Sequence, residues 1–370
     1  MKIVEVISDT NIGGAGILLC NRLECTDLNK YPTVVFLPRN SRLIPRLERI
    51  GVKIVQIDSL GDRSWSVGDV KKYKIALKKI KPDIINCHGC LSARVAAKAV
   101  RIPVKICTRH CVFPVERRER AFGIVNNWLS DVFIAVAHSA KQNLMELGIK
   151  EHKIHVIING SKALGKVSEK GKNALKRQLG ITDVSNVLVM CARLEKCKGH
   201  VCLLQAIRLL EDQGISCVAI FVGEGSEEET LKKACGELGI QKNVIFVGFA
   251  DDVSPYMSIA DININCSVGT ETSSLALSEG MSLGLPAVVS DYGGNPYMVR
   301  DGVNGYVYRM GDAVELAERI KKLIYDKETY TKMRDEALKR FDEELNCAAM
   351  TKKTNRLYDK LLGECHRTEF

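Results

Sequence analysis

Residues 186–204, NVLVMCARLEKCKGHVCLL, pass from an apolar β-branched run, through a turn holding Arg193 and Lys198, into apolar residues at helical spacing. The chain begins in the same way, with an apolar run at 2–7, the glycine-containing turn DTNIGGAG at 9–16 and a helical stretch. Apolar strands that alternate with helices are typical of parallel sheets covered on both faces. We therefore predict an α/β fold of two Rossmann-like domains whose parallel sheets face a central cleft, with ligands beyond the carboxyl ends of the strands.

The alternation of strands and helices continues along nearly the whole chain. Predicted strands occupy residues 2–7, 33–37, 53–57, 84–87, 104–108, 132–136, 154–158, 186–191, 216–222, 244–247, 262–266, 287–290 and 306–307. Predicted helices occupy residues 16–29, 70–80, 140–147, 200–213, 227–238, 275–283, 312–325 and 346–362.

One segment, NGSKALGKVSEKGK at 159–172, interrupts the alternation and has the small, polar, glycine-rich composition of a linker. We therefore place the first domain at 1–164 and the second at 165–345. The last helical stretch, within 346–370, has no strand after it and is expected to pack back on the first domain.

The composition limits the class of protein. The 370 residues are 46% hydrophobic and 26% charged, which excludes a disordered, collagen-like or coiled-coil chain. The net charge is +10, and residues 1–165, with 27 Lys and Arg against 14 Asp and Glu, carry all of the excess. This asymmetry predicts an anionic partner for the first domain.

The cysteines and the apolar runs indicate a compartment. Fourteen cysteines are scattered through the chain, several inside apolar runs, as in proteins of the reducing cytosol. We recognise no signal peptide and no apolar run of membrane-spanning length. A cytoplasmic protein is expected, at most peripheral at the inner face of the cell membrane.

The turn after the first strand contains Gly13, Gly14 and Gly16. Glycines there permit a close approach of ligand at a helix N-terminus, whose free N–H groups favour anions. The spacing is not GxGxxG and no acidic residue ends the second strand, so a nicotinamide cofactor is not expected. A plain strand–helix turn explains this loop equally well.

Arg193 and Lys198 flank the turn that opens the first helix of the second domain. Two cations beside a helix N-terminus suit a diphosphate that is neutralised without a metal ion. The alternative is a pair of solvated charges, but the location after the first strand favours a binding site.

The segment ETSSLALSE begins at Glu271 and ends at Glu279. Two carboxylates at one cleft suit the recognition of several hydroxyl groups, because each accepts O–H donors. If the helix begins near Ser273, the N–H groups of Ser274 and Leu275 would point at a phosphate. The serines could equally be plain helix caps, while Leu275 and its apolar neighbours are expected to be buried.

Together these motifs resemble the family 4 retaining glycosyltransferases of the GT-B fold. The resemblance runs through nearly the whole chain and is specific as a combination, although each piece alone is common. Its pieces are the glycine-rich loop at 9–16 and the segments 157–160, 193–199, 222–225, 271–279, 290–294 and 302–305.

The resemblance implies roles for individual residues. Arg193 and Lys198 would bind the diphosphate of a nucleotide-sugar, and Glu279 would accept hydrogen bonds from the ribose. His110, after the strand at 104–108, matches the active-site histidine, and Glu271 would contact sugar hydroxyls near the reacting carbon. The other donor-binding positions that it implies are Gly14, Gly16, Gly223, Ser274 and Leu275, with 223–225 and 244–249 lining the nucleoside pocket.

Two positions depart from the family pattern. Thr272, Ser273 and Ser274 stand where the family usually has Gly-Phe-Gly, which would tighten the sugar pocket or shift its preference. Tyr297 stands where a glutamate usually follows Gly-Gly-x-Pro.

The expected activity is retaining, hexosyltransferase-type transfer from a nucleotide-sugar, with UDP as the expected nucleotide and GDP as the alternative. The acceptor would be a lipid-linked or cell-surface polysaccharide precursor. The chain has no Asp-x-Asp motif, so neither a metal ion nor a cofactor is expected. The leaving diphosphate would help take the acceptor proton in a same-face attack. A sugar-nucleotide epimerase and a non-catalytic, nucleotide-sugar-binding assembly protein are the alternatives.

The basic surplus includes a segment at 113–128 that mixes arginines with aromatic residues after His110. Basic and aromatic residues together suit contact with an anionic membrane surface. The lysine-rich helix at 70–81 is better explained as a solvated face. We see no nucleic-acid-binding motif and expect no such partner. The membrane-facing residues would be Phe113, Arg117, Arg118, Arg120, Phe122 and Trp128.

Two cysteine–histidine clusters approach zinc-ribbon spacing: Cys87–His88–Gly89–Cys90, and Cys107 with His110 and Cys111. The second pair of cysteines is C-x3-C, and no knuckle glycines follow the pairs. Buried or cleft-lining thiols are therefore favoured over zinc.

Overall fold

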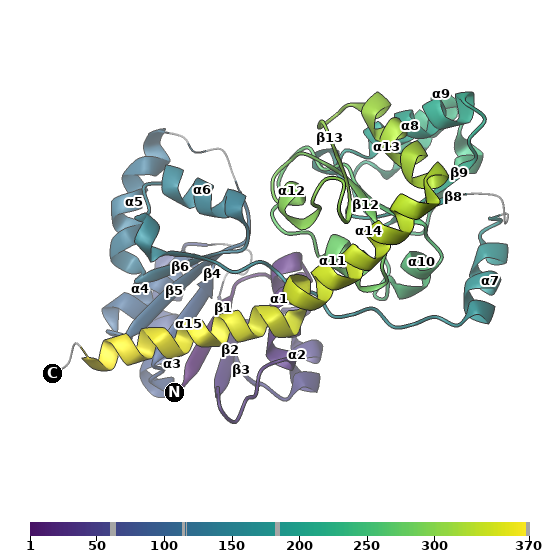
Figure 1. The fold of residues 1–370 in the computed structure, drawn as a ribbon. Helices are drawn as coiled ribbons and strands as arrows, with labels where there is room; N and C mark the ends of the chain where they lie inside the picture. Colours follow the sequence, from purple (N-terminus) through teal and green to yellow (C-terminus); the bar gives the residue numbers. More distant parts are fainter. Residues whose placement is uncertain (60–63, 113–114, 116, 182–185, 368–370) are drawn as a thin grey trace. The chain divides into compact units, whose positions relative to one another are not determined.

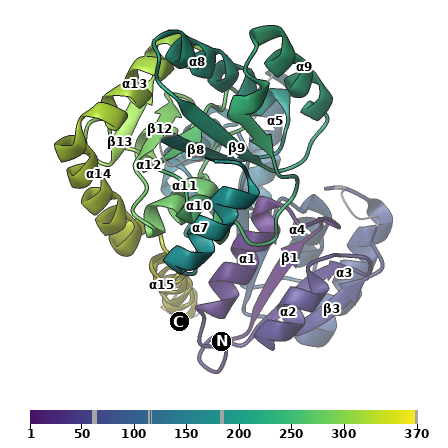
Figure 2. The same ribbon diagram turned by 90° about the vertical axis from the view of Figure 1, so that its right-hand side faces the viewer.

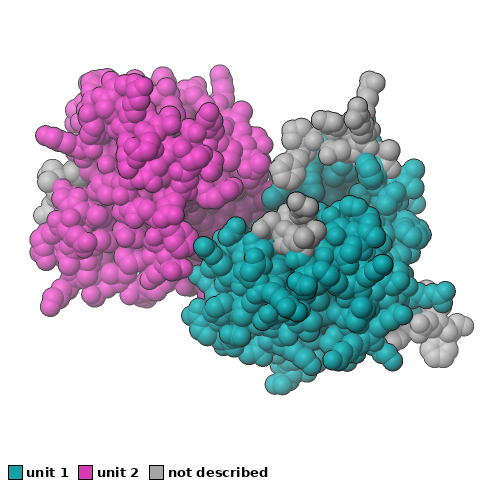
Figure 3. Space-filling view, turned by 180° about the vertical axis from the view of Figure 1, so that it is seen from behind, with its two compact units in different colours: residues 1–161, 347–370 teal, residues 162–346 magenta. Residues whose placement is uncertain are grey.

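The computed structural model describes residues 1–59, 64–112, 115, 117–181 and 186–367, with the backbone alone at 117–119, 121 and 366–367. Phe113 and the side chains of Arg117 and Arg118, predicted above to face a membrane, lie outside the described residues. The chain forms two compact units, which Figure 3 colours separately. Unit 1 comprises residues 1–161 and 347–370, and unit 2 comprises residues 162–346, within three residues of the predicted limits.

Unit 1 is built on a seven-stranded parallel sheet with the order β3-β2-β1-β4-β5-β6-β7. The strand order reverses between β1 and β4, so the carboxyl ends of these two strands form the switch point where ligands bind in such sheets. The strands are β1 Ile3–Ile7, β2 Thr33–Pro38, β3 Lys53–Ile57, β4 Ile84–His88, β5 Val104–Arg109, β6 Val132–Ala135 and β7 Ile154–Val156. The helices are α1 Gly14–Glu24, α2 Ile44–Ile50, α3 Val67–Ile80, α4 Leu91–Ala99, α5 Arg117–Leu129, α6 His138–Glu146 and α15 Cys347–Arg367.

The C-terminal helix α15 belongs to unit 1, as predicted, and lies beside α1 (Figure 1). The backbone N–H of Cys347 donates to the carbonyl of Ser161, over 2.8 Å, where α15 begins. Further along, the Thr351 hydroxyl donates to the carbonyl of Arg22 in α1 over 3.2 Å. The end of the chain is therefore a structural part of the first Rossmann-like unit.

Unit 2 is built on a six-stranded parallel sheet with the order β10-β9-β8-β11-β12-β13, and its switch point lies between β8 and β11. The strands are β8 Asn186–Cys191, β9 Cys217–Val222, β10 Val244–Phe246, β11 Ile262–Asn265, β12 Ala287–Ser290 and β13 Gly305–Tyr308. The helices are α7 Glu169–Gln178, α8 His200–Asp212, α9 Glu228–Leu238, α10 Ser254–Ser258, α11 Leu275–Ser282, α12 Asn295–Met298, α13 Ala313–Tyr325 and α14 Lys327–Arg340.

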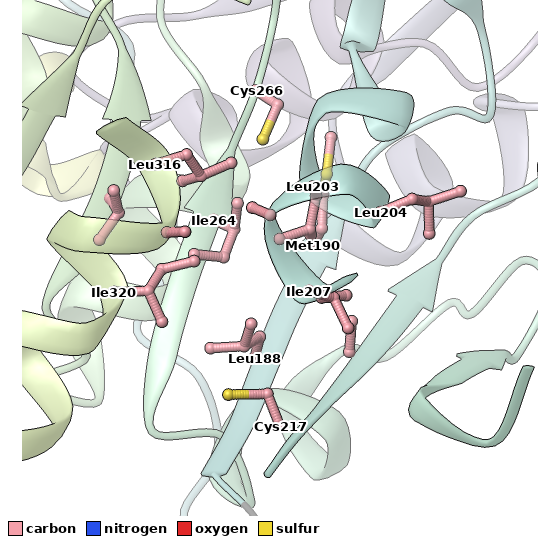
Figure 4. Close-up of a cluster of buried hydrophobic side chains, with 14 of the residues drawn as sticks. Leu188, Met190, Leu203, Leu204, Ile207, Cys217, Ile264, Cys266, Leu316 and Ile320 are labelled. Atoms are coloured by element: carbon pink, nitrogen blue, oxygen red, sulfur yellow. The ribbon is translucent and has the colours of Figure 1, made fainter. Parts of the chain in front are cut away.

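The core of unit 2 follows from the two-residue period of its central strand. Leu188 and Met190 of β8 pack with α8 and α13, as Figure 4 shows. Val187 and Val189 point to the other face and pack with residues from α7, α10 and α11. Figure 2 shows these two groups of helices on opposite sides of the sheet. Because both faces are covered, β8 is apolar from Val187 to Cys191.

Each predicted strand is present, with its ends shifted by at most two residues. The predicted helix at 16–29 was wrong at its end: α1 stops at Glu24, and Thr26 turns its hydroxyl back to the carbonyl of Arg22. The linker was also predicted too long, because Ser168 caps α7 by accepting a hydrogen bond from the N–H of Gly171. The helices that were not predicted are short, weakly periodic or, in the case of α7, partly of linker composition: α2, α4, α5, α7, α10, α12 and α14.

Within the described ranges, no helix is both long enough and apolar enough to cross a lipid bilayer.

Candidate functional site

The switch point of unit 2 brings together two residues that the sequence assigned to different parts of a ligand. Lys198 follows β8 and Glu271 follows β11. The Nζ atom of Lys198 lies 2.9 Å from Oε2 of Glu271, and the two side chains are 14% and 9% exposed. The lysine expected to bind a diphosphate and the glutamate expected to contact a sugar therefore form one largely buried ion pair.

Two further side chains hold the Glu271 carboxylate. The hydroxyl of Ser267 donates to Oε2 over 2.9 Å, and Nδ2 of Asn265 donates to the same oxygen over 3.3 Å. Both residues were missed in the sequence, although a polar Asn and Ser at the end of an apolar strand are an unusual pattern. They keep the carboxylate hydrogen-bonded independently of Lys198.

Glycines allow the loops of this site to approach one another. Gly199 ends the Lys198 turn at φ +70°, and a Cβ there would lie 2.1 Å from the carbonyl oxygen of Cys266. Gly223, after β9, has φ +150°, and a Cβ there would lie 2.1 Å from the carbonyl oxygen of Ala192. Only glycine fits either position, so the loops after β8, β9 and β11 pack directly on one another's backbone.

Helix α11 begins at Leu275, one position after its N-cap Ser274. The Ser274 hydroxyl accepts a hydrogen bond from the N–H of Leu277 over 3.3 Å, so the capping alternative holds for this serine. Leu275, expected to be buried, is half-buried because it stands in the exposed first turn. Arg193 is exposed on the loop after β8. This end of unit 2 thus combines a helix N-terminus with two cations.

Glu279 lies on α11, one turn from its end. Burial, together with the charge of Asp252, raises the pKa of the Glu279 carboxyl to about 7. A carboxyl that titrates near neutrality is unusual and points to a functional role.

The glycine loop of unit 1 follows β1, at the switch point of that sheet. Gly14 is the first residue of α1, and a Cβ there would meet no atom within 4 Å. A Cβ at Gly16 would lie 2.6 Å from Cδ1 of Leu43, so this glycine lets α1 pack against the Leu43 side chain. The two glycines therefore differ, with open space at Gly14 and a packing contact at Gly16.

His110 follows β5 and contacts His88, the last residue of β4. Nε2 of His110 and Nδ1 of His88 are 2.7 Å apart, and Nε2 of His88 lies 3.0 Å from Oε2 of Glu5 in β1. Burial and the neighbouring His88 hold the pKa of His110 well below its usual value, so its imidazole is neutral at pH 7. Glu5 is a charged residue inside the apolar run at 2–7, and its contact with His88 was not predicted.

The cysteines near His88 and His110 were considered above as zinc ligands. Cys87, Cys90 and Cys107 are buried, and burial raises the pKa of the Cys87 and Cys90 thiols. In the part of the chain that the structure describes, no three His, Cys, Asp or Glu side chains are grouped so that they could hold a metal ion.

Comparison with protein families identifies both halves of the chain. Residues 12–161 match the model described as Glycosyltransferase Family 4, and residues 171–340 match the model described as Glycosyl transferases group 1. The two matches fall in unit 1 and unit 2 respectively.

Two relatives are similar to this chain at the level of sequence. A Bacillus subtilis (strain 168) protein, named "Putative glycosyltransferase EpsD", is 29% identical over 291 residues, which are 74% of this chain and 76% of the relative. The Escherichia coli UDP-Gal:alpha-D-GlcNAc-diphosphoundecaprenol alpha-1,3-galactosyltransferase is 25% identical over 274 residues, 70% of each chain.

Among solved structures, Anabaena Alr3699/HepE in complex with UDP is similar with a TM-score of 0.85 and 22% identity, over 97% of this chain and 100% of that chain. This likeness, together with the two parallel sheets, shows that the fold is GT-B.

Proposed function

We propose that this chain, which belongs to the family 4, group 1 glycosyltransferases, transfers a sugar from a UDP-sugar with retention of configuration. It is a glycosyltransferase that uses a nucleotide-sugar. The observation that carries the proposal is the Lys198–Glu271 ion pair at the switch point of unit 2, beside the N-terminus of α11. The names of the Escherichia coli relative and the Anabaena complex support UDP as the nucleotide.

In the proposed donor complex, Arg193 and Lys198 neutralise the diphosphate and the N–H groups of Ser274 and Leu275 bind it. Glu271 accepts hydrogen bonds from sugar hydroxyls, and Glu279 accepts them from the ribose. Gly14, Gly16 and Gly223 allow the backbone to approach the donor.

In the proposed reaction, the acceptor hydroxyl attacks the anomeric carbon from the face that the diphosphate leaves. The C–O bond to the diphosphate breaks as the new glycosidic bond forms, and the acceptor proton passes to the leaving diphosphate. Arg193 and Lys198 stabilise the charge that develops there. His110 lies near the transferred sugar, and the reaction needs neither a divalent metal ion nor a cofactor.

We propose a lipid-linked acceptor, delivered to unit 1 at an anionic membrane on the cytoplasmic side. Support comes from α5, whose apolar side chains Phe122, Ile124 and Trp128 are 62%, 80% and 62% exposed. Nζ of Lys98 lies 4.9 Å from the centroid of the Trp128 ring, so basic and aromatic groups share this surface. Aromatic and basic side chains together suit the interface of an anionic bilayer. The +13 balance of residues 1–165 favours the same partner.

The proposal is tested by thermal-shift screening of nucleotide-sugars, followed by transfer to a lipid-linked acceptor and NMR of the product's anomeric proton. A UDP-sugar should stabilise the protein, and the α or β configuration of the donor should persist in the product. Lys198→Ala should weaken the stabilisation by the UDP-sugar and lower the rate of transfer by about 10²–10³, whereas Lys196→Ala, at an exposed lysine of the same turn, should change neither. Inversion, loss of turnover in excess chelator, or epimerisation without acceptor would each overturn the corresponding part of the proposal.

A further inference from the structure

A row of hydrogen-bonded side chains runs through unit 1 from His110 to the middle of the sheet. It passes from His110 to His88 over 2.7 Å and from His88 to Glu5 over 3.0 Å. The two imidazole rings are 19° from coplanar and their centroids are 5.0 Å apart. Rings whose nitrogens nearly touch at this centroid separation meet edge to edge, as an N–H···N hydrogen bond requires.

The row becomes more buried toward its inner end. His110 is half-buried, the His88 side chain is 5% exposed, and Glu5 is inaccessible to solvent. A charged residue in the centre of a parallel sheet is costly unless every charge is compensated. Oε1 of Glu5 lies 2.5 Å from Nη2 of Arg22 and accepts a hydrogen bond from the Tyr358 hydroxyl over 2.9 Å.

These partners fix the charge of Glu5. Burial alone would raise the pKa of Glu5, but Arg22, with His88 and Tyr358, outweighs it and holds the pKa below its usual value. The carboxyl is therefore an ionised group that only accepts hydrogen bonds. Since Oε2 can only accept, the proton between Glu5 and His88 sits on Nε2 of His88.

The position of this proton on His88 also determines where the proton of His110 lies. Arg22 already compensates the charge of Glu5, so the row needs no charge on His88. With a neutral His88, the proton on its Nε2 leaves an acceptor at Nδ1, which accepts from the Nε2–H of His110. That places the proton of His110 on Nε2 and makes its Nδ1 the acceptor nitrogen. One buried carboxylate thus determines the tautomer of a histidine two residues away in the row.

We propose that Glu5 and His88 are positioning residues that set the tautomer of His110 and receive the charge when His110 takes up a proton. When the acceptor proton passes through Nδ1 of His110 on its way to the leaving diphosphate, the proton on Nε2 of His110 moves to Nδ1 of His88, and it moves back once the diphosphate has taken the acceptor proton. Between these two moves the positive charge rests on His88, directly against Glu5. The inference rests on the proposed function, because it assumes that His110 faces the reacting sugar.

The C-terminal helix is part of this arrangement. Tyr358 of α15 donates to Glu5 and accepts a hydrogen bond from Nδ2 of Asn86 in β4 over 3.1 Å. Asn86 accepts in turn from the Thr108 hydroxyl of β5 over 2.8 Å. The strands that carry His88 and His110 are therefore tied to Glu5 through a second path, which holds the carboxylate in place.

The spectroscopic test uses Glu5→Gln. Arg22 and Tyr358 both donate toward Oε1, so the glutamine oxygen must face them and its NH2 group must face His88. Nε2 of His88 then becomes an acceptor, and every proton in the row moves to the other nitrogen. Long-range ¹H–¹⁵N NMR should show Nε2-protonated His110 in the natural protein and Nδ1-protonated His110 in the variant. The chain has seven histidines, and loss of signal in His110→Ala assigns the resonance.

The kinetic test uses His88→Gln, whose amide can donate to Glu5 and accept from His110 but cannot take up a proton. We expect kcat to fall by about 100-fold with the donor KM within about twofold, since general acid–base groups contribute about 10²–10⁴. Glu5→Gln should lower kcat by up to about 10⁴-fold, the effect of a wrong histidine tautomer. His152→Gln, at an exposed site, is the control.

The two tests separate the possible failures. An Nδ1-protonated His110 in the natural protein, or the same tautomer in both proteins, would overturn the inference whatever the enzyme transfers. Unchanged kcat in His88→Gln would also overturn it. If Glu5→Gln does not fold, Tyr358→Phe replaces it: removing one donor should leave the natural tautomer in place. Absence of any sugar transfer, with the tautomers as expected, would count against the proposed function alone.

Discussion

Replacing Lys198 by methionine removes one partner of the ion pair at the ends of β8 and β11 and keeps the apolar stem. Glu271 would then remain 9% exposed with the hydrogen bonds from Ser267 and Asn265 only. The variant therefore separates two roles of Lys198, compensation of a buried charge and binding of a diphosphate.

The cost follows from the burial of the pair. Removing one partner of a fully buried ion pair costs about 3–5 kcal/mol. Lys198 is 14% exposed and Glu271 keeps two donors, so we expect a smaller cost, about 2–3 kcal/mol. For a unit of this size that corresponds to a fall in Tm of about 5–10 °C. Loss of one cation at the leaving group should lower kcat by about 10²–10³.

The assay compares Lys198→Met, Glu271→Gln and the double variant in thermal unfolding and in sugar transfer. The double variant has no unpaired buried charge, so it should recover at least half of the lost stability. It should recover no activity, because both the diphosphate contact and the sugar contact are gone. Lys196→Met is the control for a change of charge in the same turn.

Two results would refute this reasoning. An unchanged Tm in Lys198→Met would mean that Glu271 does not depend on the lysine for its charge compensation. Recovery of transfer in the double variant would mean that the two residues serve only to stabilise each other.

Three further outcomes are expected. The pKa of Glu279 is raised to about 7, so its stabilising effect is present below its ordinary pKa and lost as the pH rises through about 7. Glu279→Gln should therefore gain stability relative to the natural protein between about pH 5 and pH 8. Calorimetric UDP affinity should rise with pH more steeply in the natural protein than in the variant, where only the terminal phosphate of UDP ionises, near about pH 6. Gly223→Ala should cost about 3 kcal/mol in urea unfolding, through a clash with backbone, against about 1 kcal/mol for Gly214→Ala, which shares a positive φ but has open space. Trp128→Ser should weaken co-sedimentation with anionic liposomes several-fold, whereas Val314→Ser, equally exposed in unit 2, should not change it; equal binding of the two variants would count against a membrane surface on α5.

The sheets and the order of the domains could be predicted because each strand is an apolar run bounded by turn residues. Helices were less visible where their apolar stripe is narrow, as in α14, or where the sequence has linker composition, as in α7. Ser168 illustrates the second case. Serine is common in linkers, so the composition predicts a loop there, but in the structure Ser168 is the N-cap of α7.

The candidate site was predicted where a residue type and a turn coincide, as for Lys198 and Glu271. Residues that act through burial were missed, because no local pattern shows what a strand packs against. Glu5 is the clearest example: its partners Arg22 and Tyr358 lie 17 and 353 residues away along the chain. A charged residue inside an otherwise apolar strand was the available signal, and it pointed to a buried partner.

Each unit holds a buried carboxylate near its switch point, and different types of cation compensate the two. Arg22 pairs with Glu5 in unit 1, and Lys198 pairs with Glu271 in unit 2. Arg22 is 7% exposed, lies against the Tyr358 ring and cannot lose its proton, so Glu5 is compensated permanently. Lys198 is a point charge on a flexible stem, and Glu271 keeps two other donors if the lysine turns away. The Glu5–Arg22 pair therefore keeps a permanently ionised carboxylate beside His88, as the His88–His110 row requires. The Glu271–Lys198 pair suits a site where a diphosphate competes with Glu271 for the lysine, as the proposed donor complex requires.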